Sequence, residues 1–235
     1  ITQRSYAWSY SYANSFILFD FSIRNIGLRR ITKLYFGIHI DSDVGFPPDD
    51  IGGFRATLPA PYSPSATCSY EDSVNIAWVA DADGDYLLAN NVTGARVVRL
   101  PSDDATISYN WWVDGWGLDP GFGPQDRDRI RDFGTGDDGF PEGDRNKYWL
   151  LRNGEHDYDQ AYTYVNSLGE HAQTSPAQKN VREIAQGADV YYLLSVGPFD
   201  LASGQSLPLT LAYVGGLDFH KNPDNVQNLP DNPDE

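Results

Sequence analysis

Residues 16–41 read FILFDFSIRNIGLRRITKLYFGIHID, and this stretch decides the fold. Every second residue is large and apolar in both halves: Ile17, Phe19, Phe21 and Ile23 in the first, and Leu34, Phe36, Ile38 and Ile40 in the second. Alternation with a period of two predicts half-buried β-strands. Asn25 and Gly27 lie in the connector, which predicts a β-hairpin or a short arch between the two strands.

The same period recurs in four stretches downstream. The apolar positions are Val74, Ile76, Trp78 and Ala80 in residues 73–81; Ile107, Tyr109, Trp111 and Val113 in 106–113; Val190, Tyr192, Leu194 and Val196 in 189–196; and Leu207, Leu209, Leu211 and Tyr213 in 206–214. Residues 94–100 and 147–153 are shorter strand candidates. Clusters of Gly, Pro and Asp separate these segments, which predicts an all-β immunoglobulin-like or jelly-roll sandwich with long Gly/Asp-rich loops.

Helix signals are few. Ser175 and Pro176 form a start signal and Gly187 a stop signal, which predicts a short helix over 175–187. A second, weaker pattern covers residues 157–168. Three parts are expected: an aromatic N-terminal strand over 1–15, the sandwich over 16–217, and a polar, Pro-rich tail over 218–235.

The excess of acidic residues argues against binding to nucleic acid or to anionic lipid. The 235 residues carry 17 Lys and Arg against 33 Asp and Glu, a net charge of −16. Such a chain repels nucleic acid and anionic lipid surfaces. No apolar run approaches the roughly 18 residues of a transmembrane helix, so membrane insertion is not expected. Cys68 is the one cysteine, so no internal disulfide forms.

Two Asp-dense loops follow predicted strands. IDSDVG contributes Asp41 and Asp43, and ADADGDY contributes Asp81, Asp83 and Asp85. Calcium takes six to eight oxygen ligands, and alternate carboxylates around a turn can supply several of them. The sequence therefore predicts calcium at these loops, with Asx-turns at solvated strand ends as the alternative.

Other chemical signals are weak. The sequence has no GxSxG, GxxxxGK or GxGxxG motif, and its four His residues have no metal-ligand spacing. Trp112 and Trp116 are candidates for stacking on a glycan, and covering of a loop is the alternative. Asn91 begins an NVT sequon and is a candidate glycosylation site if the protein is exported.

The N-terminus carries its own alternation. Large aromatic residues occupy every second position of residues 6–12: Tyr6, Trp8, Tyr10 and Tyr12. Four aromatic side chains on one face indicate an interface. We therefore expect a strand that is added to a neighbouring subunit, and the alternative is the first strand of the chain's own sandwich.

Several strings carry a resemblance. FDFSIRNIG, LYFGIHIDSDVG, WVADADGDY, SYNWW, PEGDRNKYWLLRNGEHDYDQ and, most specifically, GPFDLASGQSLPLTLAYVGG resemble uncharacterised secreted or cell-surface β-sandwich modules of environmental bacteria. The chain is also similar to protomers of extracellular filaments. The resemblance implies export and a sandwich fold, and it carries over no catalytic residues.

Three function hypotheses follow. The first is a non-enzymatic structural subunit that polymerises with copies of itself in an extracellular filament or cell-surface assembly. The second is an accessory carbohydrate-binding module of a larger secreted protein. The third, a glycosidase with paired carboxylates, is weak, because 33 acidic residues produce coincidental pairs in any fold.

Overall fold

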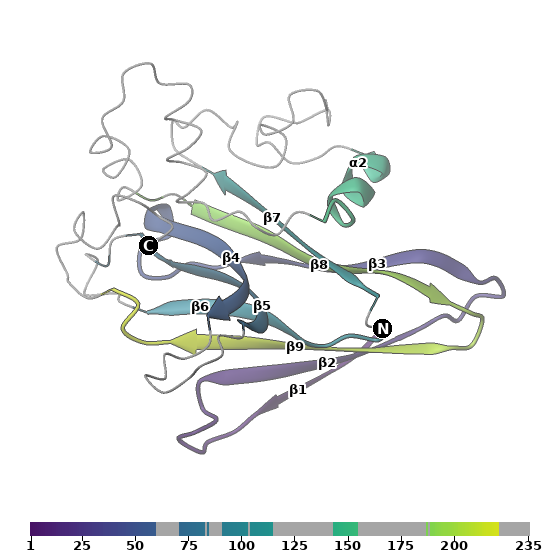
Figure 1. Ribbon diagram of the computed structural model, residues 1–235, viewed down its shortest axis with the longest axis horizontal. Coiled ribbons are helices and arrows are strands. Elements are labelled where there is room, and N and C mark those ends of the chain that lie inside the picture. The colour runs from purple at the N-terminus through teal and green to yellow at the C-terminus, as the bar shows by residue number, and fades with distance from the viewer. Residues whose placement is uncertain are drawn as a thin grey trace.

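The computed structural model describes residues 1–59, 71–82, 84, 91–102, 104–114, 143–154, 187 and 189–220. Within them the chain is all-β, with two antiparallel sheets packed as layers of a sandwich (Figure 1). The six-stranded sheet has the order β1 (Thr2–Ala7), β2 (Phe16–Arg24), β9 (Ser206–Gly216), β6 (Val92–Arg99), β5 (Glu71–Asp81) and β4 (Asp50–Pro59). The three-stranded sheet has the order β3 (Ile31–Asp41), β8 (Asp189–Leu201) and β7 (Thr106–Asp114).

The two strands predicted in residues 16–41 are present as β2 and β3. β2 and β3 belong to different sheets, so the connector is an arch that crosses the core and not a hairpin. On β3, all four alternating residues pack against the core. On β2, Phe21 and Ile23 lie opposite Leu209 and Leu207 of β9 and share their buried face.

The core lies between the sheets. The six-stranded sheet contributes Ile23, Phe54, Ala77, Val79, Ala95, Val97, Leu207, Leu209 and Leu211; the three-stranded sheet contributes Ile107, Tyr109, Trp111, Val190, Tyr192, Leu194, Val196, Phe199 and Leu201. Phe54 links the layers directly, because its ring stacks on Tyr109 with centroids 5.3 Å apart. The alternation predicted for 106–113, 189–196 and 206–214 is confirmed at these positions.

Two sequence predictions are wrong. On β5, the residues that face the inter-sheet core are Ala77 and Val79, not the predicted set of Val74, Ile76, Trp78 and Ala80. Trp78 lies on the opposite face, where its ring contacts Phe219 at 5.2 Å. Large side chains on that face are covered by the chain after β9, so the apolar alternation does not identify the core side.

The second error concerns residues 147–153. The predicted strand is replaced by α2 (Gly143–Leu150) and a turn over 151–154. This segment covers the outer face of the three-stranded sheet: the Asn110 amide donates to the Leu150 carbonyl at 3.1 Å, and the Ser195 hydroxyl to the Leu151 carbonyl at 3.1 Å. The side chains of Asn110 on β7 and Ser195 on β8 therefore hold the end of α2 and the following turn against the sheet. The helices expected over 157–168 and 175–187 lie outside the described residues, apart from Gly187.

β4 is an additional strand, preceded by the short 3-10 helix η1 (Pro47–Asp49). It pairs with β5 and forms one edge of the six-stranded sheet. Gly53 is required there, because a Cβ at that position would approach the Trp78 ring to 2.6 Å.

β1 forms the other edge of the same sheet. It pairs with β2 of its own chain through six consecutive positions, from Thr2 opposite Ser22 to Ala7 opposite Ile17. In the single chain, β1 therefore adopts the intramolecular alternative. The strand predicted over 1–15 is wrong beyond Ala7, because residues 8–15 form the turn that leads into β2, with the Ala13 N–H donating to the Tyr10 carbonyl at 2.8 Å.

Candidate functional site

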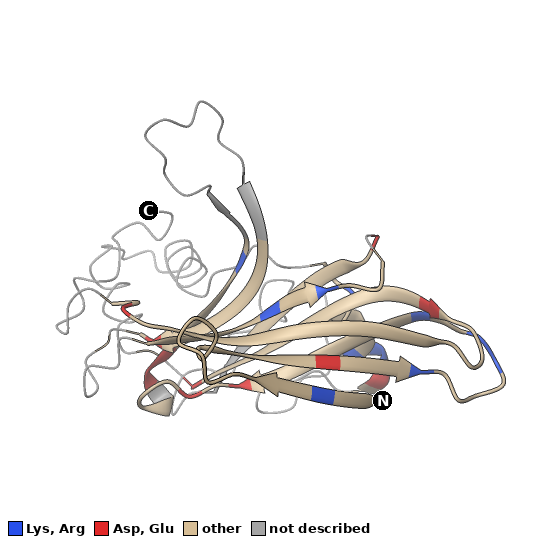
Figure 2. Ribbon diagram, turned by 90° about the horizontal axis from the view of Figure 1, so that it is seen from below, with Lys and Arg blue, Asp and Glu red and all other residues tan. Residues whose placement is uncertain are grey.

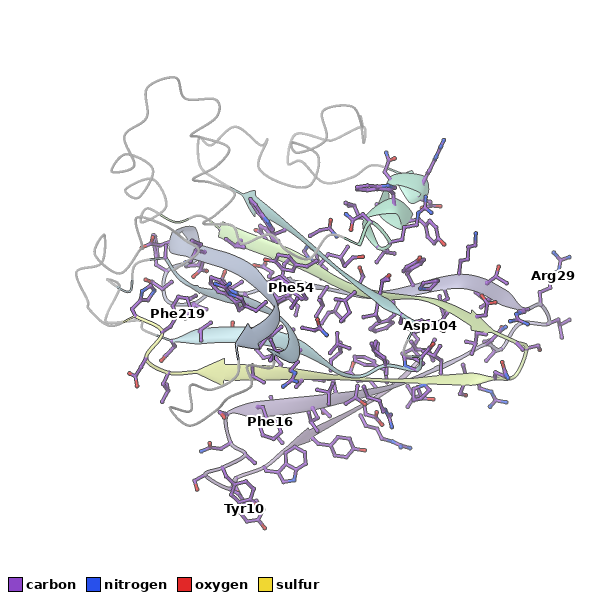
Figure 3. The ribbon with its side chains drawn as sticks, in the orientation of Figure 1. Tyr10, Phe16, Arg29, Phe54, Asp104 and Phe219 are labelled. Atoms are coloured by element: carbon purple, nitrogen blue, oxygen red, sulfur yellow. The ribbon has the colours of Figure 1, made fainter. Side chains whose placement is uncertain are left out.

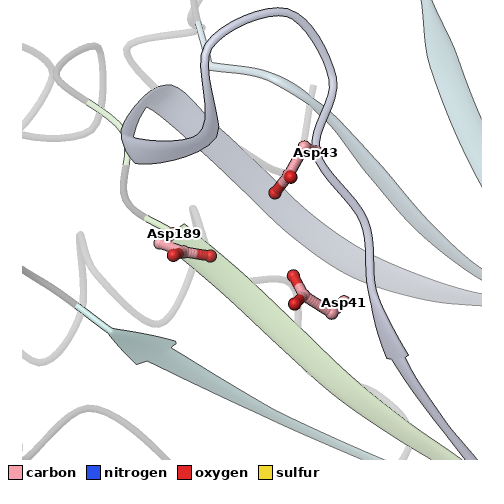
Figure 4. Close-up of side chains that lie close together, drawn as sticks. All are labelled: Asp41, Asp43 and Asp189. Carbon is pink, nitrogen blue, oxygen red and sulfur yellow. The ribbon is translucent and has the colours of Figure 1, made fainter.

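Three carboxylates converge at one end of the sandwich. Asp41 ends β3, Asp43 follows in the loop to η1, and Asp189 begins β8, the hydrogen-bonded neighbour of β3. One carboxylate oxygen from each residue lies within 4.8 Å of the others (Figure 4). Asp41 and Asp43 are exposed and Asp189 is half-buried, so the cluster opens to solvent.

Two further carboxylates lie behind this cluster. Asp50 begins β4 and Asp81 ends β5, and they are cross-strand partners that are both fully buried. The backbone N–H of Val44 donates to both Asp50 oxygens at 3.2 and 3.3 Å. The N–H of Gly84 donates to Asp81, and the His220 Nε2 lies 2.6 Å from the Asp81 carbonyl oxygen. Strand pairing therefore brings the two Asp-dense loops to one end; we call Asp41, Asp43, Asp49, Asp50, Asp81 and Asp189 the acidic end.

The surroundings of the acidic end favour the protonated form of two of its carboxyl groups, Asp50 and Asp41. Burial raises the pKa of Asp50 to about 9, and the hydrogen bond from Val44 only partly opposes it. Negative charge on three neighbours adds to the rise: Asp81, Asp43 and Asp49. Burial and the charge of Asp43 also raise the pKa of Asp41.

Only some of the five carboxylates predicted to bind calcium lie close together in the structure. Asp41 and Asp43 meet, Asp81 lies one layer deeper beside Asp50, and Asp83 and Asp85 lie outside the described residues. Sequence reasoning missed Asp189 and Asp50. A usable signal existed for Asp189, which is the first residue of the predicted strand over 189–196. None existed for Asp50, because it begins β4, a strand that the sequence analysis does not predict.

Both alternatives for the Asp loops have structural support. Asp81 accepts the N–H of Gly84 in the following turn, as the turn alternative predicts, although Asp81 is buried and not solvated. Asp41, Asp43 and Asp189 converge as ligands of a hard divalent cation would, because calcium prefers several carboxylate oxygens around one point.

The pKa of Asp50 predicts a pH-dependent stability. Between its unfolded pKa near 4 and about 9, Asp50 binds a proton in the fold but not in the unfolded chain, so stability falls as pH rises. The slope for one such group is at most about 1.4 kcal/mol per pH unit. Asp50→Asn cannot ionise and should flatten this slope in urea unfolding with chelator present. Asp104→Asn, at an exposed loop position, is the matched control; equal slopes for wild type and Asp50→Asn would contradict the assignment.

A second feature is the aromatic face, formed by Tyr6, Trp8, Tyr10, Tyr12 and Phe16. Tyr6 lies opposite Leu18 on the outer side of the six-stranded sheet, away from the core. Trp8 stacks on Tyr6 and contacts Phe16 at 5.6 Å, and Tyr10 stacks on Tyr12 with 7° between the rings (Figure 3). Tyr6 and Trp8 remain 43% and 39% exposed, so the rings contact one another and solvent.

The remaining candidates lie apart from both features. Asn91 is exposed just before β6, so its sequon is accessible, and its glycosylation stays a prediction. Trp112 belongs to β7, but the placement of its side chain lies outside the described part, as does Trp116. The glycan platform predicted from these two residues stays a prediction.

Comparison with protein-family models and with curated proteins gives no match. Within the described ranges, no helix has the length and apolar composition that crossing a bilayer requires. The acidic end, the aromatic face and the sheet edges are the features of the described chain that bear on its function.

Proposed function

We propose that the chain is a non-enzymatic structural subunit that associates with copies of itself in an extracellular filament or cell-surface assembly. The observation that supports this proposal is the aromatic face beside an open strand edge. All six residues of β1 are exposed, and in the part of the chain that the structure describes no strand lies beyond it.

Among the described residues, the edge strand β1 has little of the usual protection against strand addition. Natural sheets protect edge strands with Pro, Lys, bulges or covering loops. β1 contains Arg4 but no Pro or Lys, and its pairing with β2 is regular. Its outer N–H and C=O groups are thus suited to pair with a strand of a neighbouring copy, while exposed Tyr and Trp supply the contact area typical of interfaces.

We also propose that Asp41, Asp43 and Asp189 bind a calcium ion through their carboxylates. A bound cation would offset the repulsion among these three carboxylates, which converge within 4.8 Å of one another. Its role in a structural subunit would be to hold the β3–η1 loop against the start of β8.

A second candidate function is carbohydrate binding. The nearly parallel rings of Tyr10 and Tyr12, with centroids 5.4 Å apart and both exposed, have the character of a surface on which sugar rings stack. This candidate would be favoured over self-assembly if the monomeric chain binds an oligosaccharide and if Tyr10→Ala and Tyr12→Ala abolish that binding.

Replacing Tyr6 and Trp8 together by Ser tests the proposed function. Two central aromatic side chains contribute on the order of 1–2 kcal/mol each to an interface, so the concentration at which assembly begins should rise at least about tenfold. Sedimentation velocity over a concentration series measures this rise. Val98→Ser is the matched control, since Val98 is an exposed apolar residue of β6 in the same sheet. Equal sedimentation of wild type and the double variant would contradict the role of the aromatic face.

A further inference from the structure

The arch between β2 and β3 presents two apolar side chains to solvent. Ile26 is 92% exposed and Leu28 is 97% exposed, the two highest values among the large apolar residues of the described chain. The arch forms the end of the sandwich opposite the acidic end, as the labels Arg29 and Phe219 in Figure 3 show. Full exposure of two neighbouring aliphatic residues is unfavourable in a free monomer and indicates a contact.

This arch is held in place by hydrogen bonds. The buried Asn25 amide donates to the carbonyls of Arg29 and Leu201 at 2.8 and 2.9 Å, and its Oδ1 accepts from the Gly27 N–H at 2.9 Å. The Ser203 hydroxyl, from the β8–β9 turn, donates to the Gly27 carbonyl at 2.7 Å. The exposure of Ile26 and Leu28 is therefore built into an ordered loop.

The arch is also the basic end of an acidic protein. Four exposed cations surround the apolar pair: Arg24, Arg29, Arg30 and Lys33. Asp200 is the acidic residue beside them and pairs with Arg30 at 2.9 Å. Figure 2 shows the blue of these cations on the arch and red gathered at the other end of the strands.

The opposite end has the complementary character. Three exposed apolar residues lie at the same end of the sandwich: Phe46, Leu217 and Phe219 (Figure 3). Phe46 lies between Asp43 and Asp49 in sequence, and the segment after β9 reaches Asp81 through His220. Each end therefore combines apolar side chains with charge, and the two charges have opposite sign.

We infer that the arch of one copy docks on the acidic end of the next copy. The inference rests on the proposed function and names the contact that propagates the assembly. Ile26 and Leu28 would meet Phe46, Leu217 and Phe219, while Arg29 and Arg30 would face Asp41 and Asp43. Because the two surfaces differ and lie at opposite ends of the molecule, the contact is heterologous and repeats into an open chain.

An anionic membrane is the competing partner for an apolar loop ringed by cations. One observation favours a second copy: the same chain supplies, at its opposite end, a surface of complementary charge with exposed apolar side chains.

A charge-swap experiment tests this inference. One variant carries Arg29→Glu and Arg30→Glu, the other Asp41→Lys and Asp43→Lys, and both also carry Tyr6→Ser and Trp8→Ser so that the aromatic face does not contribute. With chelator present, we expect the Tyr6/Trp8 parent to associate end to end, each swapped protein alone to lose at least about tenfold in apparent affinity, and their equimolar mixture to recover it. Added salt should weaken the parent's association.

Ile26→Ser with Leu28→Ser is a second variant that keeps the fold, since both positions are exposed, and it should also lose association. No recovery in the mixture, or wild-type association of the Ile26/Leu28 variant, overturns the inference. If Tyr6→Ser and Trp8→Ser reduce assembly but the arch variants do not, the proposed function stands and only this inference fails. Binding of wild type to phosphatidylserine vesicles that is lost with Ile26→Ser and Leu28→Ser, with self-association unchanged, overturns it in favour of a membrane.

Discussion

Replacing Phe54 by Ala is expected to lower the free energy of unfolding by about 3–5 kcal/mol, the range for a buried aromatic residue. Phe54 is 4% exposed and stacks on Tyr109, so it joins β4 of one sheet to β7 of the other. Truncation leaves a cavity where the layers meet, and a close-packed core relaxes only partly around it. Urea unfolding monitored by tryptophan fluorescence measures the loss.

Val98→Ala is the matched control for this prediction. Val98 lies on β6 of the same sheet as Phe54 but is 52% exposed, so its truncation should change stability by no more than about 0.5 kcal/mol. A loss below about 1 kcal/mol for Phe54→Ala would show that the two sheets do not pack at this position.

Calcium should raise thermal stability, and chelation should remove the gain. At a calcium concentration about 100 times Kd, binding to the folded state alone contributes about 2.7 kcal/mol. For a chain of this size, that corresponds to a rise in Tm of roughly 5–10 °C. The response should grow as pH rises, because the ion binds ionised carboxylates and competes with the proton on Asp50.

The ligand assignment is tested by two substitutions. Asp43→Asn and Asp189→Asn should each lose most of the calcium response in a thermal melt, since both carboxylates belong to the converging cluster. Asp104→Asn, an exposed loop carboxylate, should keep the full response. An identical Tm for wild type in chelator and in calcium would rule out the site.

The strands that could be predicted from sequence are those with one clearly buried face. β3, β8 and β9 each alternate between the core and a polar or lightly covered outer side, so their periodicity identifies both strand and face. On β2 the predicted strand is confirmed, but only Phe21 and Ile23 of the predicted apolar set join the core, and Ile17 is 38% exposed. On β5 the same reasoning selects the wrong face. Trp78 is covered by Phe219, about 140 positions later, and no local pattern contains that contact.

β4 escaped prediction because Gly52 and Gly53 interrupt its apolar pattern. Gly53 is there to make room for the Trp78 ring of the neighbouring strand, so the interruption is itself a tertiary effect. The sequence predicts a strand over 147–153, but this segment forms the end of α2 and the following turn, which are tied by hydrogen bonds to Asn110 and Ser195 on the sheet below.

At the acidic end, too, some residues could be predicted from the local sequence and others could not. Asp41 and Asp43 stand out in the sequence because they are close together, and their loop geometry follows from the end of β3. Asp189 and Asp50 join them only through the pairing of β3 with β8 and of β4 with β5, which connects residues far apart in the chain. The alternation of aromatic residues over 6–12 predicts a strand, but β1 ends at Ala7, and Trp8, Tyr10 and Tyr12 lie in the segment that turns into β2. The edge position of β1 follows only from the sheet order.

The most direct test of self-assembly is the mass of the intact chain in solution, measured by sedimentation equilibrium over a wide concentration range. One chain has a mass of 26.2 kDa. We expect a weight-average mass that exceeds this value and rises continuously with concentration, as an open head-to-tail polymer requires. A mass that stays at 26.2 kDa at every concentration would contradict the account.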